Sequence, residues 1–322
     1  MLAITCPGQG AQTPGFLQPW LDVPGVAERL GWLSAVSGVD LLTHGTTSDA
    51  DTIRDTAIAQ PLIVAAALAV APAILGEADG SGGVRGTAPA DAVVAGHSVG
   101  EFAAAALAGV LSAEQAIVLV RERGRAMAAA SAVTPTGMSA VVGGDPIEVG
   151  ETLEKLGLTP ANVNGSGQVV AAGTLEQLAE LAAAPPARAR VIPLQVAGAF
   201  HTHHMAPAVD VLAQLAAAVT PAAPTARLLS NADGAVLESP TQALGRLVTQ
   251  VSNPVRWDRC LQTLADLGVT ALIELPPAGT LVGLAKRALP GVELLAVKTP
   301  DDLDAARDLV ARHAGAASGV IA

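Results

Sequence analysis

The segment Gly96-His97-Ser98-Val99-Gly100 is the part of this chain whose residue types and spacing most directly indicate covalent chemistry. It lies between an apolar run that ends at Ala95 and an alanine-rich run that begins at Glu101. A strand, a Gly-x-Ser-x-Gly turn and a helix in this order form a nucleophile elbow, which raises the serine hydroxyl at the carboxyl end of a sheet. Chance is the alternative in a chain with 33 glycines, but the flanking runs favour function. The segment therefore predicts that Ser98 is a nucleophile and that the Val99 amide donates to an oxyanion.

A serine hydroxyl is a weak nucleophile until a base takes its proton, so a histidine is expected close to Ser98 in the fold. Six histidines are available. His44 and His313 have the surroundings of surface residues, and His97 belongs to the elbow itself. The base is therefore expected in the remaining cluster, which lies within residues 201–204.

Three histidines in this cluster, His201, His203 and His204, also suggest a metal site. Two of them are adjacent in the sequence, and no cysteine or carboxylate lies at ligand spacing around them, so we expect no metal. Gly198-Ala199-Phe200 leads from a predicted strand directly into His201. This places His201 at a junction between domains, where sites commonly form, whereas the other two histidines are expected to face solvent.

Composition limits the classes of protein to which the chain can belong. Of its 322 residues, 51% are hydrophobic and 15% are charged, which is typical of a globular protein with a sizeable core. The formal net charge of −11 and the lack of a basic run exclude a nucleic-acid surface, because phosphate binding requires clustered lysine and arginine. The two cysteines, Cys6 and Cys260, are far apart and match no metal or disulfide pattern. A reducing cytoplasm is therefore the expected location.

Neither the N-terminus nor the longest apolar run indicates secretion or a membrane. The chain starts without a basic region ahead of an apolar stretch, so we expect no signal peptide. The run from Pro61 to Leu75 is shorter than the ~18 residues that a membrane-spanning helix requires, and we interpret it as a buried helix. A surface loop is expected at 77–89 and a frayed tail from Ala314. Because the chain begins at Met1 without flanking condensing or carrier modules, a free-standing protein is expected.

Short apolar strands alternate with alanine- and leucine-rich helical stretches over most of the chain, which is the pattern of a sheet with helices on its faces. The strands of this kind are expected at Leu2–Cys6, Asp91–Ala95, Arg227–Ser230, Ala271–Leu275 and Leu294–Val297. Ser98 follows the second of these strands. The alternation therefore predicts an α/β domain with a parallel sheet at its core.

The middle of the chain has a different order of elements. The expected elements are a strand at Gly137–Val142, a helix at Pro146–Leu156, two strands within Val163–Ala172, a helix at Leu175–Ala184 and a strand at Arg190–Val196. This β-α-β-β-α-β order is that of a ferredoxin-like unit. We therefore predict an α/β-hydrolase-like large domain, built from residues 1–129 and 198–322, with a ferredoxin-like small subdomain inserted at 130–197.

Further motifs follow one another along the chain. They are Pro7-Gly8-Gln9-Gly10-Ala11-Gln12, Arg123-Gly124, Asn162-Val163-Asn164, Gly198 to Thr202, Gln250 to Trp257 and Glu274 to Lys286. Together with the elbow they resemble the malonyl-CoA:acyl-carrier-protein transacylases, and the resemblance covers nearly the whole chain. It implies transfer of malonyl from malonyl-CoA to an acyl carrier protein through an ester on Ser98, for fatty acid synthesis and without a cofactor.

The resemblance also implies roles for residues around the nucleophile. His201 would be the base, and an oxygen of Gln250, from its main chain or its side chain, would orient His201 in place of a carboxylate. The backbone amides of Gln9 and Val99 would form the oxyanion hole, where two fixed donors stabilise charge that develops in the transition state. The alternative for Gln250 is an ordinary surface glutamine.

Malonyl carries a free carboxylate, and the resemblance implies that Arg123 binds it, because a planar guanidinium matches both carboxylate oxygens. Arg121 and Arg125 flank this residue, so the alternative is that all three arginines form a solvated helix face. Gly124 favours the specific role, because a glycine beside Arg123 leaves room for a neighbouring element.

Other residues are implied in substrate binding by the resemblance. Phe200 would fill the space that a 2-methyl group needs, or else be an ordinary core residue. Asn164 and His97 are further substrate-binding residues. Lys286 and Arg287 are the candidates for a local basic patch on this acidic chain, which an anionic carrier protein or a coenzyme A phosphate would require.

Two other classes of function remain open at this point. A serine hydrolase or thioesterase shares the elbow and the base but transfers the acyl group to water, and it requires neither Arg123 nor the motif at 253–257. A catalytically silent malonyl-binding or scaffold module would not need Ser98, His201 and Gln9 together. Within the transferases, the sequence does not separate fatty acid synthesis from polyketide synthesis or from the transacylase subunit of a malonate decarboxylase. A monomer is expected.

Overall fold

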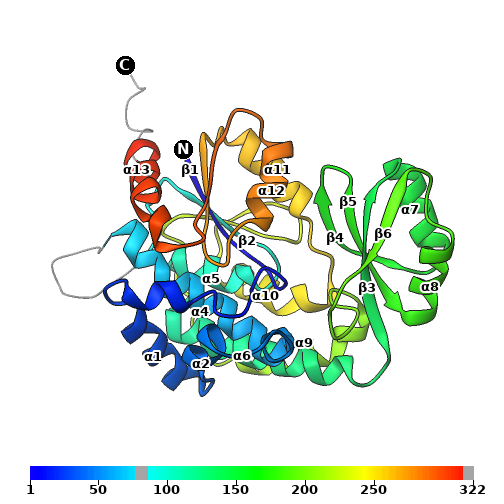
Figure 1. Ribbon diagram of the computed structural model, residues 1–322, viewed down its shortest axis with the longest axis horizontal. Helices are drawn as coiled ribbons and strands as arrows, with labels where there is room; N and C mark the ends of the chain where they lie inside the picture. Colours follow the sequence, from blue (N-terminus) through cyan, green and yellow to red (C-terminus); the bar gives the residue numbers. More distant parts are fainter. Residues whose placement is uncertain (77–85, 315–322) are drawn as a thin grey trace.

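The computed structural model describes residues 1–76 and 86–314, and the chain forms a larger and a smaller sheet within them (Figure 1). The smaller sheet and its helices are drawn in green, and the remaining colours belong to the part around the larger sheet. Residues 77–85 of the predicted surface loop and the predicted tail beyond Ala314 lie outside the described residues. Residues 86–89 of that loop have no regular secondary structure.

The larger sheet is parallel except at one edge. Its strands in spatial order are β10 (Glu293–Ala296), β9 (Ala271–Glu274), β1 (Leu2–Cys6), β2 (Val93–Gly96), β7 (Arg227–Leu229) and β8 (Val236–Leu237). The edge strand β8 pairs with β7 in the antiparallel direction, and all other neighbours are parallel. The predicted strands of the large domain are present with small differences at their ends, which confirms the α/β fold with a parallel core.

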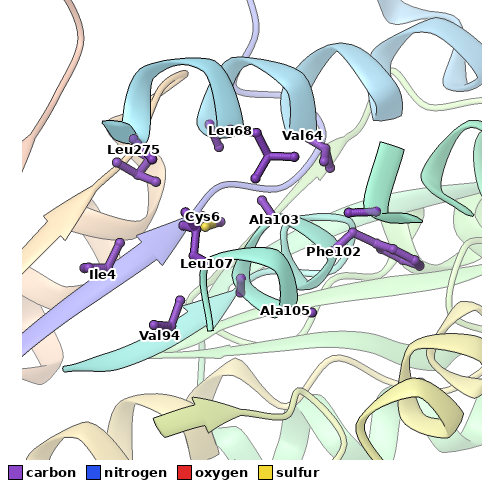
Figure 2. Packing of buried hydrophobic residues seen from close by; sticks show 14 of the residues in the cluster. Ile4, Cys6, Val64, Leu68, Val94, Phe102, Ala103, Ala105, Leu107 and Leu275 are labelled. Carbon is purple, nitrogen blue, oxygen red and sulfur yellow. The ribbon is translucent and has the colours of Figure 1, made fainter. Parts of the chain in front are cut away.

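The strands β1, β2 and β9 are buried along their whole length, because helices cover both faces of the sheet. Leu2, Ile4 and Cys6 of β1 belong to one core cluster, with α4 (Thr56–Leu75) and α5 (Gly100–Leu107). Ala3 belongs to the opposite cluster, with α11 (Trp257–Asp266) and α12 (Thr280–Ala288). Figure 2 shows side chains of β1, β2, α4 and α5 gathered in the first cluster. An apolar run without alternation is what a strand buried on both faces requires.

Helix α4 begins earlier than the sequence predicts, at Thr56 instead of Pro61. The side chain of Asp55 caps it by accepting a hydrogen bond from the Ala57 amide at 2.8 Å, and Pro61 lies inside the helix. By length and composition alone this helix is long and apolar enough to cross a membrane, but 78% of its most apolar window is buried inside the protein. Helix α4 is therefore a core helix, as predicted.

The remaining helices of the larger part surround this core. They are α1 (Val26–Ser37), α2 (Leu41–Thr46), α3 (Ala50–Arg54), α6 (Ala113–Ser131), α9 (Ala206–Ala216), α10 (Pro240–Thr249) and α13 (Leu303–His313), with short 3-10 turns at Gln18–Asp22, His203–Met205, Gln250–Ser252 and Pro300–Asp302. Helix α6 packs closely on α4 at Gly124, where a Cβ would lie 2.7 Å from the Thr56 carbonyl oxygen. The expected role of Gly124, to leave room for a neighbouring element, is confirmed.

The smaller sheet is antiparallel and has the predicted order of elements. These are β3 (Thr136–Gly143), α7 (Pro146–Lys155), β4 (Thr159–Gly165), β5 (Gln168–Thr174), α8 (Leu175–Ala183) and β6 (Ala189–Pro193). The strands lie in the spatial order β4-β5-β3-β6, and α7 and α8 pack on one face of the sheet. Strand β4 begins before the predicted Val163 because it is an edge strand, where Pro160 is tolerated. The division into domains at 129/130 and 197/198 stays a prediction.

The register of the larger sheet brings three loops together. Cys6 at the end of β1 pairs with Gly96 at the end of β2, so the loop at 7–10 and the elbow leave the sheet side by side. A Cβ on Gly100 would lie 2.2 Å from the Cys6 carbonyl oxygen. Val94 of β2 pairs with Leu228 of β7, so the residues that follow β7 reach the other side of the elbow.

Candidate active site

The elbow holds Ser98 in the left-handed region, with a φ of 52°, which residues with side chains rarely adopt. A Cβ on Gly96 would lie 2.0 Å from the Gly100 carbonyl carbon, so this turn excludes a side chain there. The Ser98 amide donates to Asn231 Oδ1 at 2.7 Å, and the Ser98 carbonyl oxygen accepts from Gln250 Nε2 at 3.0 Å. Hydrogen bonds on both sides thus fix the strained residue, while its side chain is only half-buried.

His201 is the histidine that the fold places beside Ser98. Its Nε2 lies 2.7 Å from Ser98 Oγ, and its backbone, also in the left-handed region with a φ of 62°, donates to the Val251 carbonyl oxygen at 3.0 Å. Burial, and then the positive charge of Arg123, lower the pKa of His201 to about 3. The ring is therefore neutral at physiological pH and able to take a proton from Ser98.

Gln250 orients the ring of His201 through its main chain. The Gln250 carbonyl oxygen lies 2.9 Å from His201 Nδ1. Because a carbonyl oxygen can only accept, Nδ1 carries the ring proton and Nε2 presents its lone pair to Ser98. Gln250 is buried, in the 3-10 turn that follows α10, so it is not a surface glutamine. Of the two oxygens that the sequence left open, the main-chain oxygen is the one in contact with His201.

Arg123 is fully buried next to the nucleophile. One terminal nitrogen lies 3.2 Å from Ser98 Oγ and donates to Gln250 Oε1 at 2.7 Å, and the other donates to Gln60 Oε1 at 2.7 Å. Burial lowers the pKa of the guanidinium to about 9, so it stays a cation at neutral pH. Within the described part of the chain, Arg123 Nε has no hydrogen-bond partner. A cation that only neutral side chains contact directly is thus held beside the serine hydroxyl.

The arginines on either side of Arg123 have ordinary surface roles. Arg121 and Arg125 both pair with Glu122, at 2.6 Å and 3.2 Å, and all three side chains are partly or largely exposed. The alternative of a solvated helix face therefore describes these neighbours and not Arg123, which points inward from α6.

The buried side chain of Glu101 contacts the residues that hold the elbow in place. Glu101 accepts from the Asn231 amide through Oε1 at 2.7 Å and from Gln250 Nε2 through Oε2. Asn231 Nδ2 also donates to the Gly96 carbonyl oxygen at 2.8 Å. Burial raises the pKa of Glu101, and the donated hydrogen bonds and the charge of Arg123 oppose this rise. The elbow therefore rests on a connected network of buried polar groups.

His97 and Asn164 form a separate contact between the elbow and the smaller sheet. His97 Nε2 lies 2.9 Å from Asn164 Oδ1, and Asn164 Nδ2 donates to Gln168 Oε1 at 3.1 Å. The His97 ring also packs against Trp257 in an edge-on geometry, with 5.5 Å between the ring centroids. His97 thus extends sideways from the elbow, and the two predicted substrate-binding residues contact each other.

The amides predicted for an oxyanion hole lie on the two loops that the sheet brings together. Gln9 is in the loop after β1, and Val99 precedes α5. In the described residues, neither backbone amide donates a hydrogen bond to another protein atom. The Gln9 side chain is held away from this loop, with Nε2 donating to the Arg54 carbonyl oxygen at 3.4 Å. Both amides are therefore available as donors.

The other predicted residues lie outside this network. Phe200 is buried one residue before His201, in an apolar cluster with Met127 and Met138. His203 is exposed and His204 is half-buried, with ring centroids 4.1 Å apart. Lys286 and Arg287 are exposed in the last turn of α12. No three His, Cys, Asp or Glu side chains gather to form a metal site within residues 1–76 and 86–314.

Comparison with known proteins places this geometry in a family. The acyl transferase domain family matches residues 5–299. The malonyl CoA-acyl carrier protein transacylase of Mycobacterium tuberculosis is 52% identical over 304 residues, which are 94% of this chain and 98% of the relative. The chain belongs to the malonyl CoA-acyl carrier protein transacylase family. This confirms the predicted family and the predicted enzyme class, an acyltransferase.

Solved structures of this transacylase family have the same fold. The crystal structure of the Mycobacterium tuberculosis transacylase, 51% identical, superposes with a TM-score of 0.88 over 95% of this chain and 99% of that chain. A malonyl-transacylase in complex with its type II PKS acyl carrier protein is 30% identical, with a TM-score of 0.85 over 96% of this chain and 99% of that chain. The predicted α/β fold class is therefore confirmed at the level of the whole chain.

Sequence reasoning missed two residues of the network, Gln60 and Asn231. Gln60 is a buried polar residue at the start of an otherwise apolar helix, which is a signal that such a residue has a specific partner. Asn231 follows a predicted strand next to that of Ser98, and polar residues at the carboxyl ends of parallel strands commonly line sites. Glu101 was included in the elbow motif, but its burial was not predicted.

Proposed function

We propose that this chain transfers a malonyl group from malonyl-CoA to the phosphopantetheine thiol of an acyl carrier protein, through a malonyl ester on Ser98. The observation that carries the proposal is the buried guanidinium of Arg123, 3.2 Å from the hydroxyl of a serine that also contacts a neutral histidine. A hydrolase acting on uncharged esters has no need for a buried cation at this position. An acyl group that ends in a carboxylate does.

In the first half-reaction, Ser98 Oγ attacks the thioester carbonyl carbon of malonyl-CoA while His201 Nε2 takes the hydroxyl proton. The neutral ring and the hydrogen bond from Nδ1 to the Gln250 carbonyl support this role, because the carbonyl stabilises the imidazolium that forms. When the tetrahedral intermediate collapses, the carbon–sulfur bond breaks and His201 returns the proton to the sulfur of coenzyme A. The product is the malonyl ester of Ser98.

We propose that the amides of Gln9 and Val99 bind the oxyanion of this intermediate. Their position on adjacent loops, without another protein acceptor in the described residues, supports the assignment. Donors that are already in place cost no reorganisation during the reaction, and removal of one such donor in other enzymes costs about 2.7–4 kcal/mol of transition-state stabilisation.

The second half-reaction runs the same steps with a different thiol. His201 takes the proton of the phosphopantetheine thiol, the sulfur attacks the ester carbonyl, and the proton passes to Ser98 Oγ as the carbon–oxygen bond breaks. Arg123 holds the malonyl carboxylate in both steps through its planar guanidinium. His97 and Asn164 are proposed to line the acyl group from the side of the smaller sheet, and Phe200 to exclude a 2-methyl group.

The partner in this proposal is an acyl carrier protein, as in the solved complex of a related malonyl-transacylase. The exposed side chains of Lys286 and Arg287 on α12 supply a basic site for an acidic carrier or for the phosphates of coenzyme A. Fatty acid synthesis is the proposed pathway, and polyketide synthesis and malonate decarboxylation are the alternatives. The carrier protein that accepts malonyl from the purified enzyme would distinguish the three pathways. Function as a monomer, in the cytoplasm and without a cofactor stays a prediction.

Mass spectrometry of the intact protein tests the proposal directly. Incubation with malonyl-CoA, and no carrier protein, should add one malonyl group, because the two half-reactions are separable. Ser98→Ala should abolish the adduct, and addition of a carrier protein with its phosphopantetheine arm should discharge the wild-type adduct to the carrier. An adduct that survives Ser98→Ala would disprove the role of the elbow. Discharge mainly to water in the presence of carrier would identify a hydrolase instead.

A further inference from the structure

Glu101 occupies a central position in the buried network beneath the elbow. Its side chain is only 5% exposed and projects from the first turn of α5, three residues after the nucleophile. Each carboxylate oxygen accepts one hydrogen bond, Oε1 from the Asn231 amide at 2.7 Å and Oε2 from Gln250 Nε2. Because both partners are N–H donors, both carboxyl oxygens act as acceptors, and these contacts oppose the rise in the pKa of Glu101 that burial causes.

The two partners of Glu101 hold both peptide groups of Ser98. Asn231 Oδ1 accepts from the Ser98 amide at 2.7 Å, and Gln250 Nε2 donates to the Ser98 carbonyl oxygen at 3.0 Å. The strained φ of 52° at Ser98 persists only if its surroundings enforce it. Glu101 accepts hydrogen bonds from both residues that hold Ser98 in this conformation.

Gln250 also connects Glu101 to Arg123 and His201. Its Oε1 accepts from Arg123 at 2.7 Å, and its main-chain oxygen accepts from His201 Nδ1 at 2.9 Å. The side-chain amide can adopt only one orientation here, because Arg123 can only donate and the Glu101 carboxylate can only accept. The Ser98 carbonyl oxygen requires the same orientation, so the contact with Glu101 holds in place an amide whose Oε1 faces Arg123.

We propose that Glu101 is a positioning residue, whose carboxyl group holds the side-chain amide of Gln250 and the backbone amide of Asn231 in place, and thereby keeps the nucleophile, the base and the carboxylate-binding arginine correctly placed relative to one another. The inference deepens the proposed function and rests on it for the part that concerns malonyl. Glu101 itself touches neither Ser98 Oγ nor His201 in the contacts of the described residues. Its effect on the reaction passes through its two partners.

Glu101→Gln is the sharpest single test, because it keeps the shape of the side chain but offers one acceptor and one donor to two N–H groups. Either the Asn231 amide or Gln250 Nε2 must then face another donor. A buried donor left without a partner corresponds to about a 5- to 150-fold effect. We expect the rate of acyl-enzyme formation to fall by this factor with both malonyl-CoA and acetyl-CoA. The exposed Glu151→Gln on α7 is the matched control and should match wild type.

A second substitution should restore the contact between residues 101 and 250, although it removes the hydrogen bond from residue 250 to the Ser98 carbonyl oxygen. In Glu101→Gln/Gln250→Glu, the amide at 101 donates to the new carboxylate, whose other oxygen accepts from Arg123, while the main-chain oxygen at 250 still orients His201. We expect acetyl-enzyme formation at least about fivefold faster than in Gln250→Glu alone, which lacks the same contact to Ser98 and places two carboxyl groups against each other. Malonyl-enzyme formation should stay low, because the introduced carboxylate competes for Arg123. A residue with a merely structural role would not produce this split.

The measurements are single-turnover acylation rates with each thioester and the labelling rate of Ser98 by a fluorophosphonate, which reports the nucleophile and base without any acyl substrate. Wild-type rates in folded Glu101→Gln, or a double variant no faster than Gln250→Glu alone, would overturn the inference. If circular dichroism shows that Glu101→Gln does not fold, Glu101→Asp provides the test, because aspartate keeps the charge but is too short to make both contacts. An unchanged rate of fluorophosphonate labelling in Glu101→Asp would overturn the inference. Absence of a malonyl adduct on the wild type would instead refute the proposed function, while the fluorophosphonate rates would still test Glu101.

Discussion

The larger and the smaller sheet contribute to the candidate site in different ways. On the side of the larger sheet, the groups around Ser98 are buried and connected, with Arg123 and Asn231 fully buried and Glu101 and Gln250 each 5% exposed. On the side of the smaller sheet, Asn164 is itself 7% exposed, but both of its hydrogen-bond partners, His97 and Gln168, are half-buried. We propose from this contrast that the first region sets the chemistry, whereas the second adjusts how the acyl group lies.

The energetic consequence of a substitution should differ accordingly. A buried group in a connected network leaves its partners unpaired when it is removed, which costs about 1–3 kcal/mol for a neutral group and more for a charged one. A half-buried contact can be replaced by water, so its loss costs only the net value of a hydrogen bond, about 0.5–1.5 kcal/mol. Substitutions ranked from the larger to the smaller sheet therefore test the comparison.

The largest effect after loss of the nucleophile is expected from His201→Ala. General base catalysis commonly contributes about 10²- to 10⁴-fold, and the proposed mechanism uses His201 in both half-reactions, so both should slow by this factor. His203→Ala, an exposed neighbour, is the control and should match wild type. Rapid-quench measurement of acylation and of transfer to the carrier separates the two steps. A large loss from His203→Ala with His201→Ala near wild type would move the base within the cluster.

The next effect is selective for the substrate. Arg123→Ala should cost malonyl transfer about 2–5 kcal/mol, because the malonyl carboxylate would then enter the site without a charged partner. Acetyl-CoA has no carboxylate and should lose much less, so the ratio of kcat/KM for malonyl-CoA to that for acetyl-CoA should fall. Arg123→Lys should restore part of the malonyl activity, since an ammonium cannot pair with both oxygens in one plane.

The measurement for Arg123 is kcat/KM with each thioester, together with the fraction of acyl-enzyme lost to water. Arg121→Ala is a matched control, because Arg121 lies on the same helix but pairs with Glu122. Equal losses with malonyl-CoA and acetyl-CoA in Arg123→Ala would show that Arg123 supports the fold of the site and that the carboxylate binds elsewhere.

The sequence predicted what local patterns encode, and the network beneath the elbow is not local. The strand, turn and helix around Ser98 are contiguous, so their glycines and apolar runs were sufficient to predict them. Asn231 and Glu101 lie 130 residues apart in the sequence and meet only because β2 and β7 are neighbours in the sheet. The order of strands in a sheet is a property of the whole fold and cannot be predicted from the spacing of residues along the chain. The same reason explains why Gln60, on α4, was not recognised as a partner of Arg123.

The pH dependence of the acylation rate is expected to be the next smaller effect. It concerns the positive charge of Arg123 near His201. With its pKa lowered to about 3, His201 should stay neutral, and acylation should show no loss near the ordinary value of 6.5. Arg123→Ala removes one cause of the lowering, so with acetyl-CoA its acid limb should move to higher pH than that of wild type. Rates of acetyl-enzyme formation from pH 8 down to about 3, the pKa of His201, with circular dichroism at each pH, check this; identical profiles would contradict it.

The same shift has a consequence for stability. Because the pKa of His201 is lower in the folded chain than its ordinary value of 6.5, the neutral ring favours the folded state above that pH. This contribution is lost as the pH falls from 6.5 towards 3, where the unfolded chain binds a proton that the folded chain does not. His201→Gln should therefore weaken the decline in stability over this range, measured by urea unfolding.

The smallest effect is expected at the smaller sheet, from Asn164→Ala. This change removes the hydrogen bond to His97 Nε2, but His97 keeps its edge-on contact with Trp257 and its backbone position in the elbow. A net loss of about 0.5–1.5 kcal/mol corresponds to a decrease in kcat/KM for malonyl-CoA of roughly 2- to 13-fold. Asn162→Ala is the matched control on the same strand, because Asn162 Oδ1 is buried without a partner among the described residues, so its removal should cost less. Fluorophosphonate labelling of Ser98 should be unchanged in both variants, since neither touches the network beneath the elbow. A loss from Asn164→Ala as large as that from His201→Ala would show that the smaller sheet takes part in the chemistry, and the contrast between the two regions would then be wrong.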